Sequence, residues 1–171
     1  MEIALVGKNS FRIKGKQGAF VINPSDKLTG YQAAVLLKSM DQLLPKLVGE
    51  MVVIYGAGEY EIAGIKLTGI PTNGVVVYSM NIDGVDVLIG TFSALEKAQH
   101  KLKEHAVVVM EVEAEGDSSF ISSLAMNAVL MYGEKAQEVI TAYAKEGVQE
   151  MNKYTTTKDK LPQEMDKILL Q

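Results

Sequence analysis

The stretch that decides the fold reads MVVIYGAGEYEIAGIKLTGIPT and runs from Met51 to Thr72. Its apolar start, Met51–Tyr55, predicts a buried β-strand that ends at the corner Gly56-Ala57-Gly58. A glycine corner can cradle phosphate when it has the spacing G-x-G-x-x-G and opens a helix. Here Glu61 stands in the third glycine position, and the residues after the corner alternate as in a strand. We therefore interpret the corner as a turn between two strands, where glycine tolerates a positive φ.

The composition narrows the classes of function. The chain has 171 residues, of which 47% are hydrophobic, a net charge of -4 and no cysteine. The lack of cysteine excludes disulfides and thiolate metal sites, and no basic stripe indicates nucleic-acid binding. No apolar stretch approaches the ~20 residues of a membrane helix, and the N-terminal residues do not have the pattern of a signal peptide. We expect one domain over residues 1–171, located in the cytoplasm, with no nucleic-acid or membrane partner.

The first half of the chain predicts short strands joined by turns. Hairpins are expected around Ala63-Gly64 and, most clearly, at Asp83-Gly84. The expected strands are Glu2–Val6, Ser10–Lys14, Ala19–Asn23, Met51–Tyr55, the two halves of Glu59–Thr68, Val75–Ile82 and Val85–Gly90. The segment 28–48 fits a helix, but Ala33–Leu37 fits a short buried strand equally well, because periodicity cannot decide so short a run.

After Gly90 the apolar residues change to helical spacing. A helix is predicted from Ala94 to His105 with Ser93 as its cap, and two further helices are expected at 120–125 and 136–144, the last followed by Gly147. Strands are expected at Ala106–Val112, at Asn127–Tyr132 and near the end of Lys158–Gln171. This order indicates an α+β protein with two layers of sheet covered by helices.

Four segments, in this order along the chain, resemble segments of the metallo-β-lactamase superfamily, in the branch of small UlaG-like metal-dependent hydrolases. They are IALVGKNSFRIKGKQGAFVINP, VVIYGAGEYEIAGIKLTGIPT, VYSMNIDGVDVLIGTF and DKLPQEMDKILL. The first resembles the family's opening strands and T-D-P turn, the second its glycine-rich turn, the third its hairpin ending in H-x-G-D, and the fourth its C-terminal strand. The resemblance implies a shortened αββα sandwich with a metal site at one edge between the two sheets.

In that family, histidines and aspartates hold one or two divalent ions, and a metal-bound water becomes the nucleophile. The resemblance places the main ligand motif just after Ala33–Leu37, the opening histidine before the second strand and the bridging aspartate at the end of the hairpin. The residues found at these ligand and spacer positions are Lys8, Met40, Asp41, Gln42, Leu44, Pro45 and Thr91. Every recognisable ligand is therefore replaced, and thioether, amide and apolar side chains do not form such a site.

Other candidate groups have simpler interpretations. The two histidines, His100 and His105, are predicted on different faces of one helix, near its exposed end. Glu111, Glu113 and Glu115 alternate, as on the exposed face of an edge strand or in a carboxylate site for a hard cation. Four methionines are hypothesised to fill the space of the absent metal site: Met40, Met110, Met126 and Met131.

The sequence therefore predicts a non-catalytic metallo-β-lactamase-fold protein, a pseudoenzyme that acts by binding or assembly. We expect no zinc site, no catalytic residue of the family's kind and no cofactor, and either a homo-oligomer or a protein partner. The alternative is a metal-independent hydrolase with Lys8 and Asp41 as an acid–base pair, or a small-molecule-binding protein, using the vacated cleft. The residues expected at this cleft are Lys8, Met40, Asp41, Gln42, Glu59 and Thr91.

Overall fold

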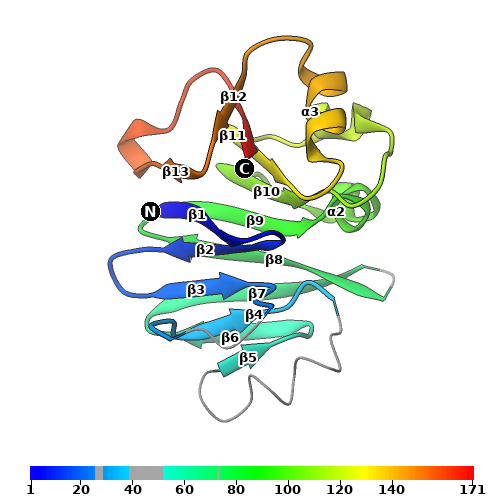
Figure 1. Cartoon of the computed structure of the whole chain (residues 1–171). Helices are drawn as coiled ribbons and strands as arrows, with labels where there is room; N and C mark the ends of the chain where they lie inside the picture. Colours follow the sequence, from blue (N-terminus) through cyan, green and yellow to red (C-terminus); the bar gives the residue numbers. More distant parts are fainter. Residues whose placement is uncertain (26–28, 39–51, 73) are drawn as a thin grey trace.

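Two β-sheets lie face to face in the computed structural model, which describes residues 1–25, 29–38, 52–72 and 74–171 (Figure 1). The first sheet has the strand order β13-β1-β2-β3-β4-β5, and the second has the order β12-β14-β11-β10-β9-β8-β7-β6. The predicted architecture of two packed sheets with helices is confirmed. Among the described residues no helix is long and apolar enough to cross a membrane.

The first sheet is antiparallel from β13 to β3 and parallel from β3 to β5. Its strands are β1 (Glu2–Gly7), β2 (Ser10–Lys14), β3 (Ala19–Ile22), β4 (Ala33–Val35), β5 (Val52–Ile54) and β13 (Lys153–Thr155). The open question about Ala33–Leu37 is thereby answered, because β4 is a buried strand. By contrast β5 has Val52 50% exposed, so the prediction of a fully buried strand there is wrong.

The second sheet is antiparallel from β6 to β9 and parallel from β9 through β10, β11 and β14 to β12. Its strands are β6 (Gly58–Ile62), β7 (Ile65–Thr72), β8 (Val75–Ile82), β9 (Val85–Thr91), β10 (Val107–Glu111), β11 (Ala128–Tyr132), β12 (Val148–Met151) and β14 (Asp166–Leu170). The helical elements are α2 (Phe92–Ala98), α3 (Ala136–Ala144) and the 3-10 turns η1 (Gln99–Lys101), η2 (Ser118–Ser123) and η3 (Lys158–Lys160).

Two hydrophobic layers hold these elements together. Along β10, Val107 and Val109 join the core between the sheets, whereas Val108 and Met110 join the core under α2 and α3. Both faces of this strand are therefore buried, which explains its continuous apolar sequence. Met110 and Met131 lie in the layer under the helices, so they do not fill space at the edge between the sheets. Met40 lies outside the described residues.

The helical boundaries differ from the predicted ones at their caps. α2 begins at Phe92 because the hydroxyl of Thr91, not that of Ser93, accepts the capping hydrogen bond, from the Ala94 N–H. α2 ends at Ala98 and η1 ends at Lys101, so His105 is not helical. The predicted helix at 120–125 is the 3-10 turn η2. α3 ends at Ala144, its C-cap residue is Lys145 at φ 51°, and Gly147 follows two residues after the cap.

The glycine corner joins the two sheets, since β5 belongs to the first and β6 to the second (Figure 1). Gly58 has φ +146°, and the Tyr60 hydroxyl donates to the Gly56 carbonyl oxygen at 3.1 Å. A side chain on Gly69 of β7 would come within 2.4 Å of that same Gly56 oxygen. The corner is thus a closely packed strand-to-strand crossing, as the sequence predicts, with no helix behind it.

Candidate binding cleft

The C-terminal ends of strands from both sheets meet at one edge of the molecule. Asn23 follows β3, and its side chain donates to Glu111, the last residue of β10. Glu111 also lies in register with Thr91 at the end of β9 and with Tyr132 at the end of β11. Lys38, beyond β4, forms an ion pair with Glu113. Ligands commonly bind beyond the carboxyl ends of parallel strands, so this edge is the natural place to look for a site.

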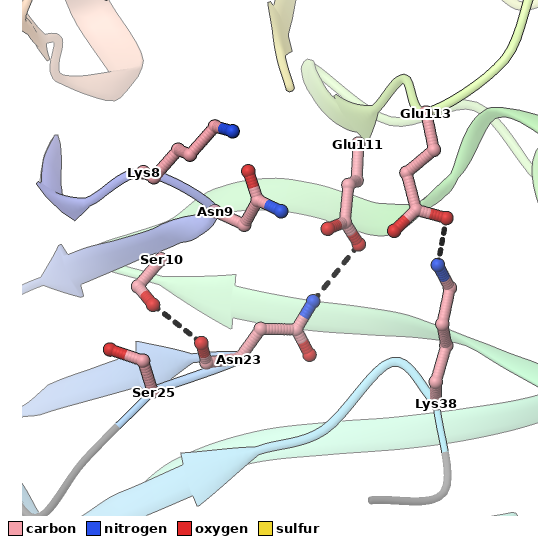
Figure 2. A pocket seen from close by; sticks show the side chains of 8 residues that line it. All are labelled: Lys8, Asn9, Ser10, Asn23, Ser25, Lys38, Glu111 and Glu113. Atoms are coloured by element: carbon pink, nitrogen blue, oxygen red, sulfur yellow. Dashed lines mark hydrogen bonds and ion pairs between the residues drawn. The ribbon is translucent and has the colours of Figure 1, made fainter. Parts of the chain in front are cut away.

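A cavity of about 480 Å³ opens at this edge. Figure 2 shows that its side chains come from both sheets, with those of Asn23 and Glu111 facing each other. It is lined by Lys8, Asn9, Ser10, Asn23, Ser25, Lys38, Glu111 and Glu113. A cavity of this volume, with several polar groups converging on it, has the size of a small-molecule site.

Glu111 is the unusual residue of the cleft. Only 3% of it is exposed, and among the described residues it has one hydrogen-bond donor, Asn23 Nδ2 at 3.0 Å. Burial raises the pKa of this carboxyl to about 7, and the nearby Lys38 opposes the rise only in part. β10 lies between β9 and β11, so the prediction that Glu111 sits on the exposed face of an edge strand is wrong. Strongly shifted carboxyls inside clefts are typical of functional sites.

Asn23 fixes the position of Glu111. Its backbone has φ 47°, a conformation that asparagine adopts more readily than most residues. Its side-chain oxygen accepts from the Leu37 N–H at 2.9 Å, which leaves the amide nitrogen directed at Glu111. The Asn23 carbonyl accepts from the Ser10 hydroxyl, and its own N–H donates to Val35 at 2.9 Å. This residue therefore ties β2, β4 and β10 together at the base of the cleft.

Both lysines of the cleft form ion pairs, whereas two buried polar atoms at or near the cleft have no hydrogen-bond partner among the described residues. Lys38 pairs with Glu113, and Lys8 pairs with Glu134 at 2.8 Å. The Asn9 side-chain oxygen and the Tyr132 hydroxyl are buried without a hydrogen-bond partner among the described residues. Burial, together with the charges of Glu111 and Glu113, raises the pKa of Tyr132 far above its usual value, so the phenol is neutral.

The expected cleft residues are only partly brought together. Lys8 lines the cleft, although 79% of its side chain is exposed. Thr91 lines an adjoining cavity of about 130 Å³ that shares Glu111 and Glu113 with the cleft. Glu59 lines a separate hollow formed by residues of β6 and β7. Met40, Asp41 and Gln42 lie outside the described residues.

The two histidines lie away from this edge. His105 precedes β10, at the strand end opposite Glu111, and is only 7% exposed, so the prediction of an exposed side chain is wrong. Its Nε2 lies 2.7 Å from the Ser79 hydroxyl and its Nδ1 lies 2.8 Å from the Lys103 carbonyl oxygen. The cavity that His105 lines does not include Ser79, so we interpret the pair as a link between β8 and β10. His100 is exposed in η1.

The donor groups of the described cleft do not fit the zinc site that the resemblance implies. Zinc sites use several imidazole, thiolate or carboxylate ligands around one point. The chain has no cysteine, and neither histidine lies at this edge. Among residues 1–25, 29–38, 52–72 and 74–171 no group of three His, Cys, Asp or Glu could hold a metal ion. Glu111 is bound by Asn23, and Lys8, which the resemblance places in the position of the opening histidine, brings an ammonium group to the cleft wall.

A solved structure with the same arrangement is a presumed Zn-dependent hydrolase of the metallo-β-lactamase superfamily from Thermotoga maritima. It aligns with a TM-score of 0.76 over 99% of this chain and 97% of its own, at 14% sequence identity. The chain has a metallo-β-lactamase-like fold. A presumed metal-dependent hydrolase from Parabacteroides distasonis aligns at TM-score 0.58 and 11% identity, over 83% of this chain and 87% of its own.

A more distant likeness is to CmlA, a diiron β-hydroxylase from Streptomyces venezuelae. It aligns at TM-score 0.52 and 9% identity, over 77% of this chain but only 44% of the larger protein. No family model matches the sequence. No curated protein matches it either. At these identities the structural likeness establishes the fold and leaves the activity to be argued from the cleft.

The sequence contained signals for Glu111, which was named only as one of three alternating acids, and for Asn23, which was not singled out. Glu111 is an acidic residue within the otherwise apolar run Val107–Val112, and a charge inside a buried strand indicates a function. Asn23 stands in the Asn-Pro turn that resembles the family's T-D-P turn. Asn9 lies in the turn between β1 and β2, and nothing in its local sequence indicates that its side-chain oxygen is buried.

Proposed function

We propose that this chain is a metallo-β-lactamase-fold protein without a metal centre, which binds a small molecule in the edge cleft. One observation carries the proposal: a cavity of about 480 Å³ persists at this edge, although neither of the two histidines lies there. A fold that had kept only a structural role would gain stability by closing this space, because packed side chains make dispersion contacts that an open cavity lacks.

The residues in two former ligand positions support this proposal. The Lys8 ammonium repels a metal cation and pairs with Glu134. The Thr91 hydroxyl accepts from the Ala94 N–H at 3.3 Å and so serves as a helix cap. A metal-bound water is the nucleophile of the hydrolases that the chain resembles, and these side chains offer no means of generating one.

The metal content of the purified protein tests the first half of the proposal. We expect zinc, iron and manganese, measured by inductively coupled plasma mass spectrometry, to remain far below one ion per chain after purification without chelators. Cells are also grown in medium supplemented with each metal, so that a site with low affinity would be occupied. About one ion per chain in any of these preparations would contradict the absence of a metal centre.

A cleft-filling variant tests the second half. Ser25→Trp places a large side chain at an exposed position of the cavity wall, and Gln137→Trp places the same side chain on the exposed face of α3 as a control. A thermal-shift panel of charged and neutral small molecules should yield stabilising compounds for the wild type and the control but not for Ser25→Trp. A panel without such compounds, or stabilisation that survives Ser25→Trp, counts against binding in the cleft.

Metal-independent hydrolysis is the second candidate, and the Glu111 carboxyl is the observation that favours it. A group with a pKa of about 7 inside a cleft is matched to general acid–base catalysis. Chelator-resistant turnover of ester or phosphodiester substrates that disappears in Glu111→Gln would favour this candidate over simple binding.

Self-association remains part of the proposal, on the argument that β5 and β6 are edge strands whose outer backbone groups are left to be covered. Light scattering at increasing protein concentration tests it directly. A monomer at every concentration would leave ligand binding as the sole proposed role.

A further inference from the structure

Among the described residues that line the cleft, each charged side chain except Glu111 has an oppositely charged partner. Lys38 is engaged by Glu113, and Lys8 by Glu134. Among the described residues Glu111 has one direct partner, the neutral amide of Asn23. Figure 2 shows its carboxyl facing the cavity beside the Asn9 side chain. An ionised Glu111 would therefore leave the cleft with an uncompensated negative charge in a place where water solvates it poorly.

The polar atom without a partner is an acceptor as well. The Asn9 amide oxygen is buried and accepts no hydrogen bond from the described residues. Buried polar atoms are nearly always hydrogen-bonded, so an acceptor at a cavity wall without a partner calls for a donor that the described residues do not supply. Figure 2 shows the amide nitrogen of Asn9 on the side of Glu111, so this oxygen reaches a ligand there by rotation about the last side-chain torsion, which is broad for asparagine.

Resting on the proposed function, we propose that the ligand of the cleft is a small organic cation with a primary ammonium group. The ammonium carries three N–H donors and one positive charge, which match one unpaired carboxylate and one free amide oxygen. Glu111 supplies the charge complement, Asn23 holds Glu111 in place from the opposite side, and the Asn9 oxygen accepts a second N–H. The organic part of the ligand lies in the remaining cavity, between Ser10 and Ser25.

Proton release should accompany binding. An ammonium ion binds the ionised form of Glu111, whereas burial raises the pKa of the free carboxyl to about 7. The affinity should therefore rise about tenfold between pH 6 and pH 8 and level off above that. Among the described residues, the other charged groups that line a cavity with Glu111 on its side of the cleft are Lys38 beyond β4, Glu113 and Glu115 on its own segment and Glu96 of α2. The Lys8–Glu134 pair lies across the cleft, and the Tyr132 phenol stays neutral throughout.

The test is a titration followed by nuclear magnetic resonance of the nitrogen-15-labelled protein, with pentylamine, 1-pentanol and pentanoate as probes of similar shape. We expect pentylamine to shift the backbone and side-chain amide signals of Asn9 and Asn23 with a millimolar dissociation constant, and the alcohol and the carboxylate to leave them unchanged. Such a constant suits a ligand of so few atoms.

Two variants complete the test. Glu111→Gln keeps the shape and the acceptor for Asn23 but removes the charge, and should weaken pentylamine binding at least tenfold and abolish its pH dependence. Glu113→Gln, which alters the carboxylate already paired with Lys38, should change the affinity less than threefold. Chemical-shift spectra of the free variants verify that both are folded.

Each opposite result overturns the inference. Pentanoate binding in place of pentylamine would assign the cleft to anions held by Lys8 and Lys38, and the proposed function would survive with another ligand class. Pentylamine binding that Glu111→Gln leaves intact, or no binding by any probe, would reject the ammonium site. Metal found in the purified protein would reject the proposed function itself, independently of these titrations.

Discussion

A single buried carboxyl group should dominate the pH response of the protein. Glu111 is 3% exposed at the end of a central strand, and burial raises its pKa to about 7 from a usual value of 4.5. Between these two values the folded protein holds a proton that the unfolded chain has released. Because the folded state binds more protons there, the free energy of unfolding falls as the pH rises through this window and is level above pH 7.

This fall of the free energy of unfolding with rising pH gives a prediction for Glu111→Gln. Glutamine is neutral at every pH, so the variant should match the wild type near pH 4, below the usual pKa of glutamate, and exceed its free energy of unfolding by about 3 kcal/mol at pH 8. Urea denaturation at the two pH values measures the difference. Glu113→Gln, at an exposed position, serves as the control and should follow the wild type. Parallel pH curves for Glu111→Gln and the wild type would show that Glu111 is ionised at little cost.

The burial and the partners of single residues were the features hardest to predict from the sequence. The burial of Glu111 results from β9 and β11, which flank β10, and its partner Asn23 lies 88 positions away along the chain. The burial of His105 likewise depends on its contact with Ser79 of β8. Local spacing suggests an edge strand for the first and a helix end for the second, because spacing does not report contacts between distant segments.

Secondary-structure elements, by contrast, follow their local signals closely. The Asp83-Gly84 and Ala63-Gly64 turns connect β8 to β9 and β6 to β7 as predicted, and both have the positive φ angles of tight hairpins. Two errors concern whole elements, because β12 was not among the expected strands and the predicted helix at 120–125 is the 3-10 turn η2. The other errors in the helices occur at boundaries, where two residues could serve as a cap. Thr91 takes the capping position from Ser93 because β9 continues to Thr91, and α2 starts at the next residue.

The cap yields a prediction at this scale. Thr91→Ala should lower the free energy of unfolding by about 1 kcal/mol, because the first turn of α2 loses its side-chain acceptor, whereas Thr91→Ser should be nearly neutral. Thermal or urea unfolding measures both. Equal losses in the two variants would show that the Thr91 methyl group matters more than its hydroxyl.

The crossing between the sheets gives a second element-scale prediction. Gly69→Ala should destabilise the protein by about 2 kcal/mol or more, because the added carbon would meet the Gly56 backbone oxygen at 2.4 Å and force β7 away from the corner. Gly56→Ala is the matched control within the same corner, since its added carbon would meet only the Tyr60 hydroxyl, at an ordinary 3.8 Å. A harmless Gly69→Ala would mean that the corner opens without cost.

At the scale of the whole molecule, the order of the motifs predicted the architecture. Neither the turn that contains Asn23 nor the corner at Gly56 is decisive alone, and it is their order and spacing together that carry the resemblance. The comparison with the Thermotoga maritima protein, at TM-score 0.76 and 14% identity, confirms the fold. The segment around Met40, where the ligand motif would lie, is outside the described residues, so the prediction for that part of the cleft stays a prediction.

The last prediction concerns the stability of the whole fold. If no metal ion links the two sheets, dialysis against EDTA followed by added Zn²⁺ should leave the midpoint of thermal unfolding unchanged within about 1 °C. A ligand that binds only the folded state stabilises it by about 2.7 kcal/mol at a hundredfold excess over its dissociation constant. A metal site would therefore shift the midpoint of thermal unfolding measurably. The control is Glu111→Gln, in which any weak zinc binding at the cleft carboxyl would be lost. A fall of the midpoint on EDTA treatment that zinc restores in the wild type would show that the fold holds a metal after all.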